Sequence, residues 1–560
     1  MIVGIDLGTT NSLIALWNGS SPELIPNALG ETLTPSAISI ADDGSILVGR
    51  PALDRLITHP DRSVASFKRW MGSTMGATLA GKVFRAEELS ALMLRALRDD
   101  AESQFGQNVT EAIVSVPAYF SDPQRRATLD AARLAGLKVE RLINEPTAAA
   151  LTHGLQGTEE GHFLILDLGG GTFDVSLLHK YEGIMEVRAS AGDSMLGGND
   201  FRDVLVELIA TAAGIKFSDV KAADQARLMA TAEAVKHTLS QREQADWDIH
   251  LDDKETCKGT LTRASFEERA QGLNARLRAP IERAIADARL DPAQIDQIVL
   301  VGGATRMPLV RTMTAKLFGR FPLIDPRPDH VVALGAAIQA GLKARHAALD
   351  DIVMTDVCPF TLGVATVDLS MRDDLLLSPI IERNAVIPIS RTNRYFTVQD
   401  NQSKLQFKVL QGEHLRASQN IQIGEILVDI PRAPAGHESA EARFTYDVNG
   451  ALEVEVTVTS TKMVERRVFR NQSNLTDDEI NARFRTLAAL KLAPRDQASN
   501  HALIARAERL YAESLGERRT LIAELVGQFE REINDQHLRN AEDLRARFAA
   551  LLDDFERNVF

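Results

Sequence analysis

Two short glycine-containing segments of the same kind, far apart in the sequence, place the strongest constraint on the fold of this chain. The first reads Asp6-Leu-Gly-Thr-Thr10 and the second Asp167-Leu-Gly-Gly-Gly-Thr172, so their aspartates stand 161 positions apart. Each follows an apolar strand, and glycine lets the backbone amides of such a turn approach phosphate oxygens closely. The pair therefore predicts two phosphate-binding loops on opposite walls of one cleft.

These loops provide both amide donors and side chains for a nucleotide. The threonine hydroxyls would donate to phosphate oxygens together with the glycine amides. The leading aspartates would hold hydrated Mg²⁺, which takes few protein ligands when phosphates supply the others. One such loop would equally suit a plain strand-ending turn, but two copies led by aspartate favour a nucleotide site. The expected residues are Asp6, Gly8, Thr9, Thr10, Asp167, Gly169, Gly170, Gly171 and Thr172.

Two further segments are candidates for contacts with the base and the ribose. Gly302-Gly303-Ala-Thr-Arg306 follows an apolar strand and would close around an adenine, with the arginine stacking on its face; an exposed turn is the alternative. Glu233, Lys236 and Ser240 are spaced i, i+3 and i+7, which places them on one face of a helix. They would reach ribose hydroxyls and adenine, and a surface ion pair is the alternative.

The first 345 residues alternate short apolar strands with helical stretches. This pattern predicts an α/β architecture with sheets buried on both faces. The clearest strands are residues 2–6, 112–116, 163–167 and 297–301. Residues 346–357, which mix aspartates with apolar residues, are predicted to be a linker. Because 560 residues exceed what one hydrophobic core usually supports, several domains are expected.

The remaining sequence predicts two further units of different character. Residues 358–472 contain turns such as Asn449-Gly450 and alternating strands. In the strand 452–459 every second residue is apolar, as in a half-buried antiparallel sheet. Residues 473–560 have helical spacing and open with Thr476-Asp-Asp-Glu479, a capping-box pattern. We therefore expect a β-sandwich followed by a small helical unit.

Charge and cysteine content narrow the partners and the compartment. Sixty-three basic against seventy-seven acidic residues leave a net charge of −14, which repels a nucleic-acid backbone. Cys257 and Cys358 are the two cysteines, without metal-ligand spacing, so neither a disulfide framework nor a zinc site is indicated. No leader pattern and no membrane-length apolar run stand out. We expect a cytoplasmic protein that binds neither nucleic acid nor membrane.

Seven motifs, in family order, resemble the DnaK-type seventy-kilodalton heat-shock chaperones, most of all their divergent bacterial HscC branch. The likeness covers essentially the whole chain and weakens in the terminal helices. The motifs are Asp6-Leu-Gly-Thr-Thr-Asn-Ser12, Val116-Pro-Ala-Tyr-Phe120, Asn144-Glu-Pro-Thr-Ala-Ala-Ala150, Asp167-Leu-Gly-Gly-Gly-Thr-Phe-Asp174, Val301-Gly-Gly-Ala-Thr-Arg-Met-Pro308, Asn401-Gln-Ser403 and Val409-Leu-Gln-Gly-Glu413.

The resemblance implies a fold and an activity. The fold would be an actin-like ATPase domain of two lobes with a duplicated core, then a β-sandwich that binds peptides, then a short helical lid. The activity would be ATP hydrolysis coupled to binding and release of hydrophobic segments of unfolded polypeptides, as in stress-response chaperones. Implied cofactors are ATP or ADP, Mg²⁺ and K⁺. Implied partners are a J-domain cochaperone and a nucleotide-exchange factor.

The resemblance also assigns residues that the patterns alone do not reveal. Lys68 takes the catalytic position, although Phe67-Lys-Arg69 reads as a surface basic pair, and Asn11 joins the first phosphate loop. Thr172 is assigned a place beside the γ-phosphate, and around the metal ions and the attacking water stand Asp6, Glu145, Asp167 and Asp174. Coupling between domains is assigned to Pro117, Arg125 and Asp356, and the J-domain contact to Arg141. The peptide pocket is assigned to Val364, Val367, Tyr395, Val398, Leu405 and Phe407.

Several positions depart from the family pattern. The linker core reads Ile352-Val-Met-Thr355, where the family shows leucines, so weaker docking is expected. About a dozen residues separate Gly72 from Phe84, which puts the usual exchange factor in doubt. About six residues are inserted after Val367, and Leu405 replaces a smaller residue, so a smaller peptide cavity is expected.

Two other functions suit the same ATPase fold. A small-molecule kinase would use Asp174 or Glu145 as a base toward a sugar hydroxyl, and an actin-like protein would form filaments. Neither has an obvious use for a β domain attached by a linker. The chaperone function is therefore favoured.

Overall fold

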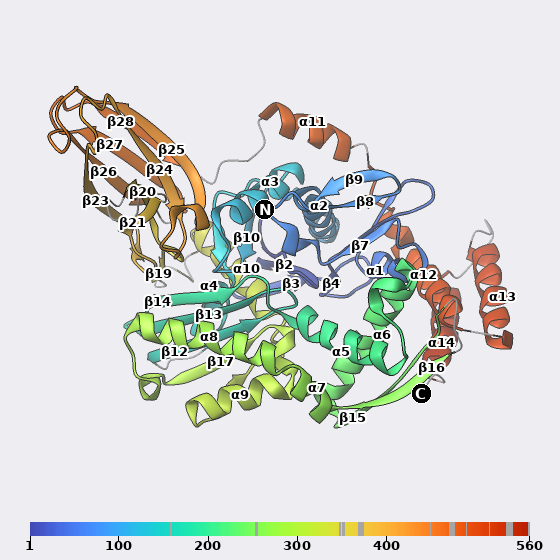
Figure 1. The fold of residues 1–560 in the computed structure, drawn as a ribbon. Helices are drawn as coiled ribbons and strands as arrows, with labels where there is room; N and C mark the ends of the chain where they lie inside the picture. The colour runs from blue at the N-terminus through green and yellow to red at the C-terminus, as the bar shows by residue number, and fades with distance from the viewer. Residues whose placement is uncertain are drawn as a thin grey trace.

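Two large β-sheets form the framework of the N-terminal part of the molecule (Figure 1). This computed structural model describes residues 1–156, 160–251, 256–346, 349, 353–367, 375–447, 450–469, 477–488, 490–514, 516–533 and 541–557. The predicted Asn449 turn, the Thr476 capping box, the Ile352 part of the linker and the insertion after Val367 lie outside these residues.

The first sheet has the order β11-β10-β1-β2-β3, with β4 paired to β2. β1 pairs parallel with β10 and antiparallel with β2, so the first predicted phosphate loop is the turn between β1 and β2. The bounds are β1 (Ile2–Asp6), β2 (Asn11–Trp17), β3 (Pro22–Ile25), β4 (Thr34–Pro35), β10 (Glu111–Val116) and β11 (Leu142–Asn144).

The second sheet has the order β18-β17-β12-β13-β14-β19-β22. Its first five strands repeat the first sheet, because β12 also pairs antiparallel with the strand after it and parallel with β17. The second phosphate loop is thus the equivalent turn, between β12 and β13. The bounds are β12 (Gly161–Leu168), β13 (Phe173–Tyr181), β14 (Ile184–Asp193), β17 (Gln297–Val301), β18 (Leu323–Ile324), β19 (Val353–Val357) and β22 (Val386–Ile387).

Helices α4 (Glu145–Gln156) and α10 (Val331–Lys343) pack against each other and join the two sheets. Their small side chains make this close approach possible, since the shared core contains Ala148, Ala149, Ala336 and Ala340 beside strand residues of both halves. The halves are therefore held together on one side and form a cleft on the other.

Further elements complete each half. The first half adds β5 (Ala37–Ile40), β6 (Ile46–Val48), α1 (Arg50–Thr58), β7 (Ser63–Ala65), η1 (Phe67–Trp70), β8 (Gly76–Leu79), β9 (Lys82–Arg85), α2 (Ala86–Phe105) and α3 (Asp122–Leu134). The second adds α5 (Gly198–Ala212), η2 (Phe217–Asp219), α6 (Ala222–Gln241), β15 (Gln244–Ile249), β16 (Cys257–Thr262), α7 (Arg263–Arg269), α8 (Gln271–Ala288), η3 (Pro292–Gln294), η4 (Gly303–Arg306) and α9 (Pro308–Phe318).

A β-sandwich follows, with sheet orders β21-β20-β24-β25 and β23-β26-β27-β28. β27 alternates buried and half-buried residues along its length, which confirms the alternation predicted from sequence. The bounds are β20 (Leu362–Val367), β21 (Leu375–Ile381), β23 (Ile389–Phe396), β24 (Lys404–Gln411), η6 (Ala417–Gln419), β25 (Ile421–Asp429), β26 (Ser439–Tyr446), β27 (Leu452–Val458) and β28 (Val464–Phe469).

The last three helices of the chain lie on the far side of the molecule from the β-sandwich, whereas the helix before them lies over α3 (Figure 1). α11 (Asp477–Ala488) contacts α3, a short turn η7 (Arg495–Gln497) follows, and α12 (Ala498–Glu513) packs on α1. α12, α13 (Gly516–Ile533) and α14 (Ala541–Arg557) share one core. The helical unit expected as a lid thus contacts the first half. Among the helices that the structure describes, none is both long and apolar enough to cross a bilayer.

Candidate functional site

A cleft of about 630 Å³ opens between the two halves, and both predicted phosphate loops line it. The predicted residues on its wall are Asp6, Gly8, Thr9, Thr10, Asn11, Lys68, Glu145, Asp167, Gly169, Gly170, Thr172, Glu233, Lys236, Ser240, Gly302, Gly303 and Arg306. Residues from both ends of the ATPase sequence are therefore brought to one site.

The two phosphate loops approach each other across the cleft. A Cβ atom placed on Gly170 would lie 1.8 Å from Thr10 Oγ1, so a larger residue here would force the Thr10 side chain to move. On the opposite side, Ser36 Oγ donates to the carbonyl oxygen of Gly8 at 2.8 Å. The first loop is thus held by its own half, and the two loops together form a narrow floor for an anion.

A second glycine segment supports the loop after β12 from behind. The N–H of Gly198 donates to the carbonyl of Gly169 at 2.9 Å, and the N–H of Asn199 donates to the carbonyl of Gly170 at 2.8 Å. A side chain at Gly197 would come within 2.5 Å of the phosphate-loop backbone, so glycine is required here. The start of α5 therefore fixes the shape of the loop.

Buried acidic groups surround a single buried lysine. Lys68 Nζ donates to Glu145 Oε1 at 2.6 Å, and both side chains are almost fully buried. Burial, followed by repulsion from Glu145, raises the pKa of Asp6 and of Asp174 to about 7. The same causes raise the pKa of Asp167 well above its usual range. The reading of Phe67-Lys-Arg69 as a surface basic pair does not hold for this lysine.

The acidic groups suit a hydrated cation. Buried Asp167 Oδ2 has no hydrogen-bond partner in the structure, and a positive ion would offset the clustered negative charge. In the described part of the chain, no three His, Cys, Asp or Glu side chains form a ligand cage by themselves. Mg²⁺ would therefore need phosphate oxygens and water to complete its shell, as it commonly does.

The opposite end of the cleft is polar. Lys236 Nζ donates to Glu233 Oε2 at 2.8 Å and to the carbonyl of Gly198 at 3.1 Å. Burial lowers the pKa of Lys236, which is not the behaviour of a surface ion pair. Arg306 Nη2 contacts Asp329 Oδ2 at 2.8 Å from the turn after β17. These positions can meet a base and a ribose.

Two predicted residues lie outside the cleft wall. Asp174 is 1% exposed and accepts a hydrogen bond from the Tyr119 amide at 3.0 Å. Gly171 turns its carbonyl toward Arg69 Nε, 3.1 Å away. In this structure Asp174 is hydrogen-bonded to the backbone of the first half, and the carbonyl of Gly171 to the side chain of Arg69.

Two of the residues expected to couple the domains, Arg125 and Asp356, are connected by hydrogen bonds through Asn144 beside the cleft. Asp356 of β19 accepts from Asn144 Nδ2 at 2.9 Å and from Thr147 Oγ1 at 3.3 Å. Arg125 Nη2 donates to Asn144 Oδ1 at 2.7 Å. Burial raises the pKa of Asp356, and the nearby Arg125 and Arg141 oppose this effect. Asn144 directly precedes Glu145, so these hydrogen bonds lead to the buried Lys68–Glu145 ion pair.

Pro117 belongs to a turn that reaches both the cleft and the β-sandwich. It is buried, and its carbonyl accepts from the Phe120 amide at 3.1 Å. Between them, Tyr119 binds Asp174 through its amide and packs its ring 4.4 Å from that of Phe360. This turn thus connects a buried carboxylate to the segment that enters the β-sandwich.

Polar contacts fasten the β-sandwich to the second half. Arg383 forms two hydrogen bonds with Asp287 of α8, at 2.7 and 2.8 Å, and one with Glu413 at 2.9 Å. Asn384 Nδ2 donates to Asp287 at 2.8 Å, and its oxygen accepts from the Ser190 amide at 2.8 Å. These contacts lie next to β22, whose pairing with β19 brings the two parts into register.

The six predicted peptide-pocket residues are not equally accessible. Three of them belong to the core of the β-sandwich, namely Val364, Leu405 and Phe407. Tyr395 packs edge-on against Phe407 with ring centroids 5.6 Å apart. Val367 and Val398 are 52% and 46% exposed. The structure therefore places three of these residues in the core of the β-sandwich and two at exposed positions, Val367 at the end of β20 and Val398 in the loop after β23.

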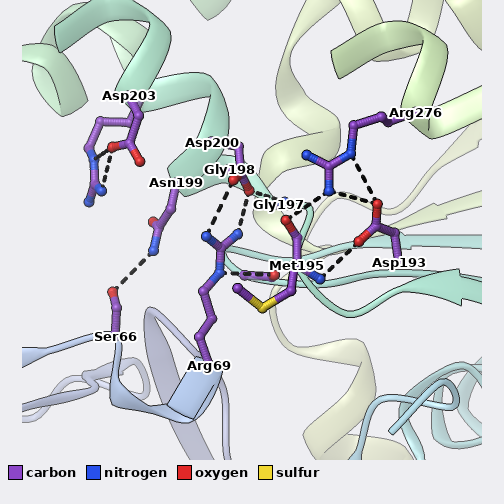
Figure 2. Close-up of polar contacts among 12 residues, drawn as sticks. Ser66, Arg69, Asp193, Met195, Gly197, Gly198, Asn199, Asp200, Asp203 and Arg276 are labelled. Atoms are coloured by element: carbon purple, nitrogen blue, oxygen red, sulfur yellow. Dashed lines mark hydrogen bonds and ion pairs between the residues drawn. The ribbon is translucent and has the colours of Figure 1, made fainter. Parts of the chain in front are cut away.

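Some cleft and loop residues have no signal in the sequence. Arg69 directly follows Lys68, and Asp200 lies on α5 of the other half, yet Arg69 and Asp200 form an ion pair (Figure 2). Asp329 lines the cleft from a proline-rich turn. Such pairs depend on contacts between distant segments, which the sequence does not reveal.

Comparison with known proteins extends over the whole chain. A family model described as "Hsp70 protein" matches residues 2–79 and 73–558. A curated relative, "Chaperone protein dnaK3" of Thermosynechococcus vestitus, is 38% identical over 609 residues, which cover 100% of this chain and 88% of that protein.

Proposed function

This chain belongs to the Hsp70 family, and we propose that β19 carries the signal between its ATPase cleft and its peptide site. The family is one of ATP-dependent chaperones with an actin-like ATPase domain and a β-sandwich for unfolded polypeptides. The chain is accordingly an ATP-hydrolysing chaperone that uses ATP or ADP with Mg²⁺. The kinase and filament functions are not favoured.

We propose specific roles in hydrolysis. Amides of the two phosphate loops would hold the phosphates, and Lys68 would point its charge at the oxygens that gain negative charge in the transition state. Glu145 would keep that ammonium group in place through their 2.6 Å contact. Asp6 and Asp167 would bind the water shell of Mg²⁺, which shields phosphate charge when bound. Thr172 would lie beside the γ-phosphate, and Asp174 near a K⁺ ion.

The observation that carries the coupling proposal is the place of β19 in the second sheet. It pairs parallel with β14 at Ile184↔Val353 and antiparallel with β22 at Asp356↔Ile387. It therefore touches the ATPase sheet on one side and the base of the β-sandwich on the other. Any rotation of the halves that displaces β14 would disturb both pairings.

Two contacts support a link from the cleft to this strand. The first runs from Lys68 through Glu145 and Asn144 to Asp356. The second runs from Asp174 through Tyr119 to Phe360. Both begin at groups whose positions would respond to the γ-phosphate. ATP hydrolysis would thereby release the strand and let the peptide site close.

The C-terminal helices would act as the lid of the peptide site. In this structure they rest on α1, away from the β-sandwich (Figure 1), which supports an open peptide site in the docked arrangement.

We further propose Arg141 as part of a J-domain contact, and the HscC branch as the nearest subgroup. The tight β8–β9 hairpin, with Ala80 and Gly81 at positive φ, supports an altered exchange-factor contact.

The coupling proposal is tested by peptide release. The dissociation rate of a fluorescent extended peptide from the full chain should rise on addition of Mg²⁺ with ATP and stay low with ADP. Equal rates with the two nucleotides would show that the cleft does not control the peptide site.

A further inference from the structure

Arg69 connects the two halves of the ATPase behind the second phosphate loop. Lys68 lines the cleft, whereas Arg69, its neighbour in η1, does not. The guanidinium group of Arg69 forms an ion pair with Asp200, and its Nε donates to the carbonyl of Gly171 at 3.1 Å. Figure 2 shows the arginine rising from the first half toward the start of α5.

This contact completes a row of three backbone carbonyls that are held from the same side. The carbonyls of Gly169 and Gly170 accept from the amides of Gly198 and Asn199, and the carbonyl of Gly171 accepts from Arg69. In a planar trans peptide the N–H points opposite to the C=O. The three following amides, ending with that of Thr172, are therefore directed the other way, toward the cleft, as in an anion-binding nest.

The third donor differs from the first two in its origin. Gly198 and Asn199 belong to the same half as the loop and hold it whether or not the halves close. Arg69 belongs to the opposite half, so its bond to Gly171 forms only when the halves come together. Ser66 makes a second contact of this kind by accepting from Asn199 Nδ2 at 3.1 Å, but that contact holds a side chain and not the loop backbone.

Burial and neighbouring contacts give the Arg69 pair a fixed geometry. The side chains of Arg69 and Asp200 are only 14% and 20% exposed. Asp200 Oδ2 also accepts from the Gly197 amide at 2.7 Å, so the carboxylate is held before the arginine arrives. The planar guanidinium group of an arginine can donate to the carboxylate and to the carbonyl at the same time. The single ammonium group of a lysine cannot reach both acceptors from this position.

We propose that Arg69 is a positioning residue that turns the Thr172 amide toward the γ-phosphate when the two halves close. The inference rests on the proposed placement of the phosphates at this loop. It explains why the arginine follows the catalytic lysine directly. The short turn η1 would then place the charge of Lys68 on the cleft side of the phosphates, while Arg69 donates a hydrogen bond to the far side of the loop after β12.

Dissociation constants for ATP and ADP with Mg²⁺ test the inference. In Arg69→Ala, ATP should bind about tenfold more weakly, equivalent to about 1.4 kcal/mol. The dissociation constant for ADP, which lacks the γ-phosphate, should change by less than about twofold. Arg69→Lys should keep the ion pair but not restore the ratio of the two constants. An equal loss for both nucleotides, no loss, or full recovery with lysine would each overturn the inference.

Arg276→Ala is the matched control. Arg276 of α8 holds the same segment from within its own half, through Asp193 and the Met195 carbonyl (Figure 2), and its side chain is 44% exposed. This variant should keep the wild-type ratio of the dissociation constants for ATP and ADP. A changed ratio would mean that general loosening of the segment explains the weaker ATP binding of Arg69→Ala.

Gly170→Ala separates this inference from the proposed site itself, because the added Cβ would collide with Thr10 Oγ1. It should abolish binding of both nucleotides. Intact binding in Gly170→Ala would refute the phosphate placement. Lost binding there, with an unchanged ratio in Arg69→Ala, would refute only the role of Arg69.

Discussion

Lys68 has the environment of a group that acts on developing charge. It is 4% exposed, contacts Glu145, and lies 5.5 Å from the ring centroid of Phe120. Because little water is present to screen it, the charge of this buried ammonium group acts strongly on a ligand in the cleft. Its contribution should therefore appear mainly in the chemical step.

We predict that Lys68→Ala nearly abolishes single-turnover ATP hydrolysis while ATP binding persists. Loss of a donor aimed at the transition state costs roughly 3–4 kcal/mol, or about 10²- to 10³-fold in rate. Binding persists because the loop amides remain. Lys82→Ala, on the exposed β9 hairpin of the same half, is the control. A decrease of less than about tenfold would contradict the assigned role.

The peptide pocket offers a second test at a single residue. Leu405 is 8% exposed and lies opposite Val428 in the β24–β25 pair. If it narrows the pocket, leucine-centred peptides should bind more weakly than valine- or alanine-centred ones, since overpacking costs about 1–3 kcal/mol, roughly 5- to 150-fold.

Leu405→Val should then restore binding of leucine-centred peptides, measured as dissociation constants without ATP. Leu427→Val makes the same change at a 52% exposed position of the neighbouring strand and should leave peptide preference unchanged. An unaltered preference in Leu405→Val would show that this residue belongs to the sandwich core alone.

At the scale of elements, the local pattern of apolar residues was enough to predict those strands whose own residues favour a strand. The predicted strands 2–6 and 297–301 coincide with β1 and β17. Both phosphate loops also lie at the cleft, because each loop is fixed by the strand that ends in it. The alternation in β27 followed from period two.

Contacts between segments that are distant in the sequence could not be predicted from local pattern. Residues predicted as a linker include β19, whose strand geometry comes from pairing with β14 and not from its own composition. The carbonyl of Gly171 faces Arg69, 102 positions earlier. Asp174 is turned to the Tyr119 amide for the same reason. Sequence spacing carries no information on such partners.

The β19 strand yields the prediction for Asp356→Asn. This change keeps the shape of the side chain and removes the negative charge of the group that accepts from Asn144 and Thr147. We expect normal basal hydrolysis but loss of ATP-triggered peptide release, because coupling free energies are typically only about 1–3 kcal/mol. The exposed Asp429→Asn serves as control. Release at the wild-type rate in Asp356→Asn would disprove the role of this carboxylate.

At the scale of the whole molecule, the C-terminal helices are attached to the first half by specific polar contacts. Arg509 of α12 donates to Asp54 of α1 at 3.0 Å and to Glu556 of α14 at 2.6 Å. Upstream, the backbone of residues 491 and 493 pairs with Ile46 at the edge of β6. Docking of the helices thus depends on a few buried charges.

Arg509→Ala should loosen this docking, because it leaves Asp54 partly buried without its cation, at a cost of about 1–3 kcal/mol. We expect faster hydrogen exchange in α1 and α12 and unchanged exchange in α8. Arg547→Ala, at an exposed ion pair within α14, should have no such effect. Unchanged protection of α1 in Arg509→Ala would mean that apolar packing alone holds the helices.

The pairing of β19 with β22 has a consequence for unfolding. One hydrogen-bonded sheet of seven strands continues from the ATPase into the base of the β-sandwich, so heat cannot melt either part without breaking strand pairs of the other. Calorimetry of the chain in this arrangement should show one cooperative transition whose enthalpy covers both parts. Conditions that break the pairing of β19 with β14 should divide this single transition into two independent transitions, as expected for separate cooperative units.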